Sequence, residues 1–251
     1  LAVSSVLVLA QHRHGNYSTF RSAIDDVILT IIGFLFVDDT DLILFADHPG
    51  ISPATMVNRL QHRVSAWQGS LHATGGALRA DKCSWGIAAF HWERGQPKYH
   101  TIQSLPTAPV SVIDHHDEER TIERLCASTP VTVLGVVQAL DGSMAGQLNA
   151  LTQKATNMGN RLRDSNITPR IAWQGLRSMI WPSLRYCLPA TVFTRAEGRQ
   201  ALLPLVKQLL PKLAASRHAP HEHPPAPSTL HGPGLPDPYT QHGIPPAQYI
   251  T

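Results

Sequence analysis

Two adjacent aspartates, Asp38 and Asp39, carry the most distinctive chemistry in this 251-residue sequence. They lie between two apolar runs, residues 27–37 and 42–46, and this pattern favours a buried β-hairpin with both carboxylates at its tip. Neighbouring carboxylates repel each other, so a site that keeps both ionised needs a cation. Mg²⁺ is typically bound through one or two carboxylates together with phosphate oxygens. Two such ions would assist a phosphoryl transfer.

Two other interpretations of these aspartates remain open. An exposed acidic turn is the simpler one, because Asp is a common turn residue and a second pair, Asp25 and Asp26, lies nearby. A prenyl transferase would use an Asp-Asp-x-x-Asp helix, but here Asp41 follows after one residue in a strand-like context, which disfavours that class. Asp41 shares a strand face with Asp39, where it either tunes the charge or faces solvent.

The elements around the aspartates can be predicted from spacing. Ser52 and Pro53 begin an amphipathic helix that runs to about His72, and the glycine pair at residues 75–76 ends it. We expect a short strand pair within residues 84–100 and a polar surface connection over 101–124. A further apolar strand is expected over 131–137.

The second half of the chain is predicted to be helical and is strongly basic. Apolar spacing predicts helices over 144–162, from Thr168 to an interruption at Pro182, and over 202–213, where Pro204 and Pro211 would kink or end the helix. Residues 154–217 hold 11 Lys and Arg against 2 Asp and Glu, whereas residues 1–153 hold 10 against 14. A basic block of this kind suggests a polyanion partner, although basic helices can also be merely solvated.

Three segments resemble, in order, three motifs of reverse transcriptases. Residues 33–42, Gly-Phe-Leu-Phe-Val-Asp-Asp-Thr-Asp-Leu, are similar to motif C, in which an aromatic-X-Asp-Asp turn joins two palm strands. Residues 73–78, Ala-Thr-Gly-Gly-Ala-Leu, followed by Lys82, resemble motif D. Residues 133–136, Val-Leu-Gly-Val, are similar to motif E, the primer grip in retrotransposons without long terminal repeats.

The resemblance implies an α+β fold for residues 1–217. Residues 1–142 would form a partial polymerase palm, an antiparallel sheet with a hairpin and a packed helix, and residues 143–217 a basic helical thumb. Residues 218–251, which hold nine prolines and five histidines, are expected to form an extended, disordered tail.

The resemblance also implies roles for individual residues. Asp38 would be the main ligand of Mg²⁺ or Mn²⁺ and Asp39 a weaker one. Lys82 would lie near the phosphates of the incoming nucleotide and protonate the pyrophosphate leaving group, although a surface lysine after a turn fits the sequence equally well. Contacts to nucleic acid are implied beside the aspartates, at the primer grip and on the first thumb helix: Phe36, Val37, Leu134, Gly135, Lys154, Arg161 and Arg163.

The implied reaction is attack of a primer 3′-hydroxyl on a deoxynucleoside triphosphate, directed by an RNA template. The family also needs a motif A aspartate, motif B and the fingers, but only 37 residues precede Asp38, and Asp25 and Asp26 lie too close to it. We therefore expect a fragment that is inactive alone, whose missing parts an upstream polypeptide segment would supply. The first residue, Leu1, also suggests upstream sequence. The alternative is a non-catalytic retroelement remnant that binds nucleic acid through its basic helices.

The apolar stretches and the cysteines of the sequence bear on where the protein is located. The longest uncharged apolar stretch, residues 27–37, falls short of the roughly 20 residues that a membrane-spanning helix needs, so no membrane partner is expected. The cysteines Cys83, Cys126 and Cys187 are odd in number and widely spaced, which favours reduced thiols in an intracellular protein of the nucleus or cytoplasm rather than a secreted one.

Overall fold

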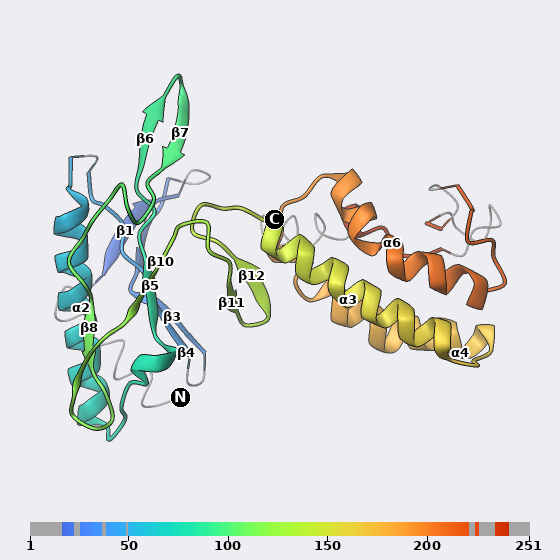
Figure 1. The fold of residues 1–251 in the computed structure, drawn as a ribbon, viewed down its shortest axis with the longest axis horizontal. Coiled ribbons are helices and arrows are strands. Elements are labelled where there is room, and N and C mark those ends of the chain that lie inside the picture. Colours follow the sequence, from blue (N-terminus) through green and yellow to red (C-terminus); the bar gives the residue numbers. More distant parts are fainter. Residues whose placement is uncertain are drawn as a thin grey trace. The chain divides into compact units, whose positions relative to one another are not determined.

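The computed structural model describes residues 17–22, 26–36, 39–48, 50–220, 224–225 and 234–240. The chain divides into two compact units, Leu1–Ala127 and Ser128–Thr251. Each unit buries an apolar cluster of its own. The content of helices and small, mostly antiparallel strand pairs confirms the predicted mixture of α and β structure (Figure 1). The functional division at residues 142 and 217 stays a prediction.

The strands of the first unit associate in pairs. Four of the pairs are antiparallel: β1 (Ser18–Arg21) with β2 (Ile28–Ile31), β3 (Gly33–Phe36) with β4 (Asp39–Leu42), β6 (Phe90–Glu93) with β7 (Gln96–Tyr99), and β8 (Ser111–Ile113) with β9 (Glu119–Thr121). The fifth pair is parallel and joins β5 (Ser84–Gly86) to β10 (Glu123–Leu125). The pair expected within residues 84–100 is therefore β6–β7 alone, because β5 pairs elsewhere.

The long apolar stretch around the aspartates forms parts of two hairpins rather than one. A hairpin at this place is confirmed, but Asp39 belongs to the strand β4 instead of the tip, and Ile28–Ile31, which is mostly exposed, pairs with β1. Asp26 explains the difference, because it adopts a left-handed φ of 61° in the turn and forms an ion pair of 2.9 Å with Arg21. The chain turns back at Asp26, so β2 pairs with β1 and is not part of the β3–β4 hairpin.

The predicted amphipathic helix is confirmed as α2 (Pro53–Ala73). The Ser52 hydroxyl accepts a hydrogen bond of 3.1 Å from the Thr55 amide, and Gly75 supplies a φ of 81° after the last turn. The buried cluster of the first unit gathers one face of this helix and the strands beside it, through Val57, Trp85, Val110, Val112 and Ile122.

The prediction of a surface connection over residues 101–124 was wrong. Val110 and Val112 are buried while Ser111 between them is only partly buried and Ile113 is exposed, so the segment contains strands that lie beside α2, as Figure 1 shows for β8. Two glutamine side chains of α2 hold β8 through its backbone. Gln61 accepts from the Ser111 amide at 2.8 Å and donates to its carbonyl at 3.0 Å, while Gln68 bonds Ile113 in the same two ways.

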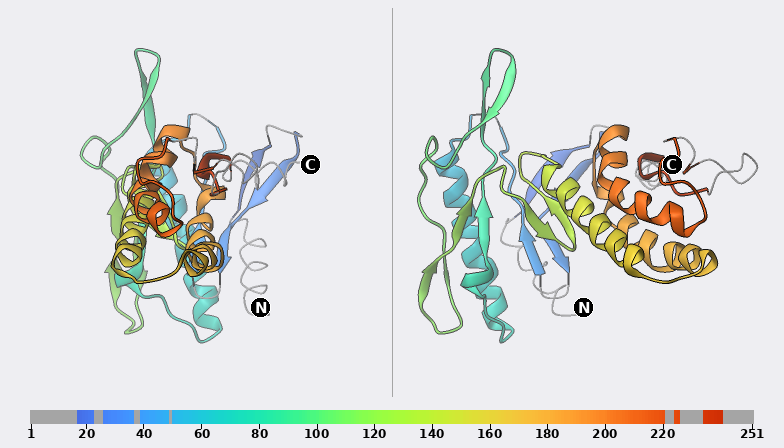
Figure 2. Two further views of the ribbon diagram at one scale, coloured as in Figure 1. Left: turned by 90° about the vertical axis from the view of Figure 1, so that its right-hand side faces the viewer. Right: turned by 45° about the vertical axis from the view of Figure 1, so that its right-hand side comes forward.

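The second unit is built on two long helices, α3 (Ala145–Asp164) and α6 (Arg195–Lys212). They lie side by side in all the views of Figures 1 and 2. A Cβ atom at Gly159 would lie 2.8 Å from the Pro204 carbonyl oxygen, so glycine permits this close approach. The α3 helix confirms the prediction for residues 144–162.

The prolines of the second unit interrupt its helices less than the sequence predicts. α4 (Pro169–Gly175) continues through a π-helical segment, η2 (Leu176–Ile180), into α5 (Trp181–Arg185), so the helical path passes Pro182. The wider π turn accommodates the proline ring and the missing N–H. α6 likewise runs through Pro204 and Pro211, because buried leucines on both sides hold it to the core.

The segment predicted as one strand over residues 131–137 is a hairpin. β11 (Val131–Val133) pairs with β12 (Val136–Gln138) across a two-residue turn, and α3 contacts β12. Part of the proline- and histidine-rich segment also packs. Leu235 is buried in the helical core, and Asp237 forms an ion pair of 3.2 Å with Arg195. After α5 the chain also forms a short 3₁₀ turn, η3 (Leu188–Ala190).

Candidate functional site

The β3–β4 hairpin positions the acidic residues on which the functional prediction rests. Phe36 pairs with Asp39, so the two-residue connection consists of Val37 and Asp38, which lie outside the described residues. The backbone of Phe36 is described in β3. Asp39 is therefore the first residue of the returning strand, and its side chain is exposed.

Gly33 allows the two strands of this hairpin to approach each other closely. A Cβ atom built at Gly33 would overlap the carbonyl oxygen of Asp41 on the facing strand. A glycine is therefore required at this register position, four residues before the turn.

Asp41 shares the exposed face of β4 with Asp39, as the alternation along a strand predicts. Partial loss of contact with water raises the pKa of the Asp41 carboxyl above its usual value, and the negative charge of Asp39 raises it further. The two carboxylates therefore create a negative potential along one face of the strand, which a cation would relieve.

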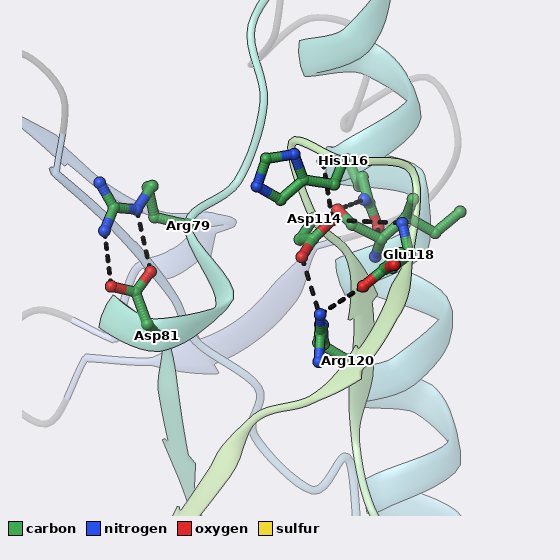
Figure 3. Close-up of polar contacts among 8 residues, drawn as sticks. Arg79, Asp81, Asp114, His116, Glu118 and Arg120 are labelled. Carbon is green, nitrogen blue, oxygen red and sulfur yellow. Dashed lines mark hydrogen bonds and ion pairs between the residues drawn. The ribbon is translucent and has the colours of Figure 1, made fainter.

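Lys82 is the last residue of a short 3₁₀ turn, η1 (Ala80–Lys82), and its side chain is exposed. The neighbouring Asp81 is held by Arg79 at 2.6 Å (Figure 3), which leaves the ammonium group of Lys82 outside that ion pair. Among the residues that the structure describes, no hydrogen bond or ion pair joins Lys82 to Asp39.

Figure 3 also shows a polar turn next to β8 that has a structural role. Asp114 accepts hydrogen bonds from the amides of His116 and Glu118 at 2.8 and 3.2 Å, and Arg120 donates to its other oxygen at 3.3 Å. The hydrogen bond from the His116 amide contributes most to lowering the pKa of the Asp114 carboxyl, and the other two bonds lower it further. The carboxylate caps the turn between β8 and β9.

The predicted primer-grip residues form the turn of the β11–β12 hairpin. Leu134 and Gly135 both have left-handed φ angles, of 49° and 79°. This combination is typical of a type I′ turn, in which leucine is unusual. The Leu134 side chain is 43% exposed, and a Cβ at Gly135 would lie 3.5 Å from the ring of Tyr186. The turn therefore presents an apolar side chain beside an exposed aromatic ring.

The three basic residues predicted on α3 differ in their surroundings. Lys154 donates to the Ser183 carbonyl at 2.7 Å, and Arg163 forms an ion pair of 2.9 Å with Asp164. Arg161 is exposed and has no ion pair within the described part of the chain. Lys154 and Arg161 lie within roughly 20° of each other around the helix axis, whereas Arg163 lies on the opposite side. The three do not form one contact surface.

Within the described ranges, no group of three or more His, Cys, Asp or Glu side chains is arranged to hold a metal ion. Asp38 lies outside those ranges, so its binding of a metal ion stays a prediction. No helix in the described part of the chain is long and apolar enough to cross a membrane. All three cysteines are free thiols.

The burial of one charged residue, Arg63, is not among the predictions from the sequence. Arg63 is only 4% exposed, although it is an arginine on a surface helix. It lies three residues after Leu60 and four before Trp67, so it interrupts the apolar face of α2, and that spacing was the signal to follow.

The comparisons with known proteins identify no relative of this chain. No family model, no curated protein and no solved structure matches the sequence or the fold.

Proposed function

We propose that the chain is the C-terminal palm and thumb portion of a reverse transcriptase, from a retrotransposon without long terminal repeats. In the intact parent, a primer 3′-hydroxyl would attack the α-phosphate of a deoxynucleoside triphosphate on an RNA template. Mg²⁺ or Mn²⁺ would hold the reacting oxygens, and catalysis would come mainly from positioning and electrostatics.

The β3–β4 hairpin is the observation that carries this proposal. Phe36 pairs with Asp39, so Asp39 begins the exit strand directly after Asp38 in the sequence. Asp39 is exposed, and Asp41 adds a second carboxylate to the same strand face. Two carboxylates on one exposed strand face suit a hard divalent cation.

Two further turns support the proposal through their order along the chain. Lys82 follows a glycine turn and is exposed, as a residue that reaches nucleotide phosphates must be. The Leu134–Gly135 turn then comes directly before the basic helices, the position that a primer grip occupies ahead of a thumb.

Metal binding at the hairpin tests the proposal directly. We expect Mn²⁺, added to the full chain, to broaden the amide NMR signals of residues 36–41 first, and Asp38→Asn to abolish this broadening. The second acidic turn supplies the matched control, because Asp26 is already neutralised by Arg21 at 2.9 Å. Broadening that persists in Asp38→Asn, or that is equal at residues 25–26, would contradict the proposal.

Primer extension tests the expectation that parts of the enzyme are missing. We expect the full chain to extend no primer on an RNA template when it is supplied with deoxynucleotides and Mg²⁺. Extension that Asp38→Ala abolishes would show instead that this chain is a complete catalyst.

A second candidate function is nucleic-acid binding without catalysis. The charge of the helical segment favours it, since residues 154–217 hold 11 Lys and Arg against 2 acidic residues. We expect the affinity of the full chain for a primer-template duplex to fall steeply with salt.

Arg161 and Arg163 provide a matched pair for this measurement. Arg161→Gln should reduce the slope of log affinity against log salt by about 0.9 if its guanidinium contacts a phosphate. Arg163→Gln should change it less, because Asp164 already holds that guanidinium at 2.9 Å. Binding that does not depend on salt would exclude this function.

A further inference from the structure

The buried Arg63 borders a pocket of about 300 Å³ in the first unit. One side of the pocket is formed by Arg59, His62 and Arg63, which lie on adjacent turns of α2 and therefore face the same way. Leu44, Phe45 and Asp47, from the segment that follows β4, line it as well. A helix face with three nitrogen-bearing side chains thus borders a hollow at the base of the β3–β4 hairpin.

Arg63 forms its hydrogen bond with an uncharged backbone group. Its guanidinium donates a hydrogen bond to the carbonyl oxygen of Ile43, which links α2 to the chain leaving β4. Burial lowers the pKa of this guanidinium, and the nearby charge of Asp47 raises it in part. An arginine stays charged in proteins even so, and a buried charge without a close counter-ion is costly.

The charges around the pocket do not balance. Asp47 is the carboxylate that lines it, and its Oδ2 atom is already held by Arg59 at 2.6 Å. Two guanidinium groups therefore share one carboxylate, and His62 adds an imidazole N–H donor to the same side of the pocket. Within the described residues, no ion pair joins Arg63 to a carboxylate. The pocket carries an excess of one positive charge.

We propose that this pocket binds a phosphate group, held by Arg59, His62 and Arg63. Guanidinium forks match phosphate oxygens in geometry as well as in charge, and three donors from one helix face suit a group with several oxygens. The bound phosphate would give the Arg63 guanidinium a close counter-ion, and Leu44 and Phe45 would contact the group that carries the phosphate. This proposal does not rest on the polymerase proposal, because it uses none of the acidic hairpin residues.

Titration of the full chain with phosphate ligands tests the site. Inorganic phosphate, adenosine monophosphate and a short single-stranded oligonucleotide would be added separately at constant ionic strength, with acetate as a carboxylate control. We expect the amide NMR signals of residues 59–63 to shift with inorganic phosphate and to shift less with acetate. Tighter binding of the monophosphate identifies a nucleotide-like source, and tighter binding of the oligonucleotide identifies a nucleic-acid backbone.

Three variants make the test specific, because one should weaken phosphate binding, one should strengthen it and one should leave it unchanged. All three leave Arg63 and its bond to Ile43 in place. Arg59→Gln should weaken phosphate binding about fivefold, whereas Asp47→Asn should strengthen it by a similar factor, because the competing carboxylate is removed. Arg79→Gln is the matched control, since Arg79 is another exposed arginine paired with an aspartate at 2.6 Å and lines no part of this pocket. It should leave the affinity unchanged.

The outcomes separate the proposal from non-specific attraction. Absence of shifts at residues 59–63 with every phosphate ligand would overturn it, as would equal binding of acetate. Equal losses in Arg59→Gln and Arg79→Gln would show that only the overall charge matters. A loss in Asp47→Asn would show that the carboxylate organises the pocket instead of competing for it, and would also overturn the proposal.

Discussion

Gly33 determines how closely the strands of the β3–β4 hairpin approach each other. Because a Cβ atom at this position would overlap the Asp41 carbonyl oxygen, we expect Gly33→Ala to force the strands apart and to destabilise the first unit by about 1–3 kcal/mol. Urea unfolding measures the loss.

Gly69 provides the control for the same substitution. It lies inside α2, and a Cβ atom there would meet nothing within 4 Å. Gly69→Ala should therefore stabilise the helix by up to about 1 kcal/mol. Equal effects at the two positions would contradict the close approach of β3 and β4.

Asp114 couples the stability of the β8–β9 turn to pH. Its carboxylate accepts two backbone hydrogen bonds and one from Arg120, so its pKa in the folded state lies below the ordinary value of 3.8. A carboxylate of this kind stabilises the folded state above its unfolded pKa, and the contribution is lost as the pH falls through the folded pKa.

Replacing Asp114 by asparagine tests this coupling. We expect Asp114→Asn to lose less stability than the wild type between about pH 5 and pH 3, because asparagine cannot take up the proton. The free energy of unfolding, measured by urea titration at several pH values, gives the difference. Identical pH profiles for the two proteins would show that Asp114 is not a source of the acid sensitivity.

The contact between α2 and β8 depends on two glutamines rather than on apolar packing alone. Gln61 satisfies both the amide and the carbonyl of Ser111, at 2.8 and 3.0 Å. Gln61→Ala would leave these backbone groups without their partner, so we expect the first unit to lose about 1–3 kcal/mol. Gln153→Ala, at an exposed position of α3, should change stability by less than about 0.5 kcal/mol, as a thermal unfolding series would show.

The helices were predictable from the sequence to a greater degree than the strands. The apolar spacing in α2 and α3 repeats over five turns, and clear capping residues mark the start of α2. The strands hold only three or four residues each, so their periodicity is weak, and their partners depend on tertiary contacts. This is why residues 28–31 were assigned to the wrong hairpin and why Val110 and Val112 were not recognised as core.

The candidate site was predictable only in part for the same reason. The sequence predicted both Asp38 and Asp39 at a hairpin tip, because acidic residues between apolar runs mark a turn without any tertiary information, and the structure begins β4 at Asp39. The position of Arg63 within the apolar face of α2 is a local signal of its burial, but its partner, the Ile43 carbonyl after β4, depends on a tertiary contact that no local pattern specifies.

At the scale of the whole molecule, the two units are expected to unfold separately. Val110 and Leu184 are each fully buried, one in each apolar cluster. Leu184→Ala should cost the second unit about 2–5 kcal/mol and leave the first unchanged, whereas Val110→Ala should destabilise only the first. Differential scanning calorimetry of the full chain would show one of two transitions moving in each variant. A single transition that both variants shift would indicate one cooperative unit.

The parallel pairing of β5 with β10 has a consequence for the order of folding. It joins Trp85 to Arg124, so the chain between them must close into a loop before the pair can form. Both β6–β7 and β8–β9 lie inside that loop and form from neighbouring residues, on a timescale of about 1–10 μs for an isolated hairpin. In pulse-labelling hydrogen exchange during refolding, the amides of these hairpins should become protected before those of β5 and β10.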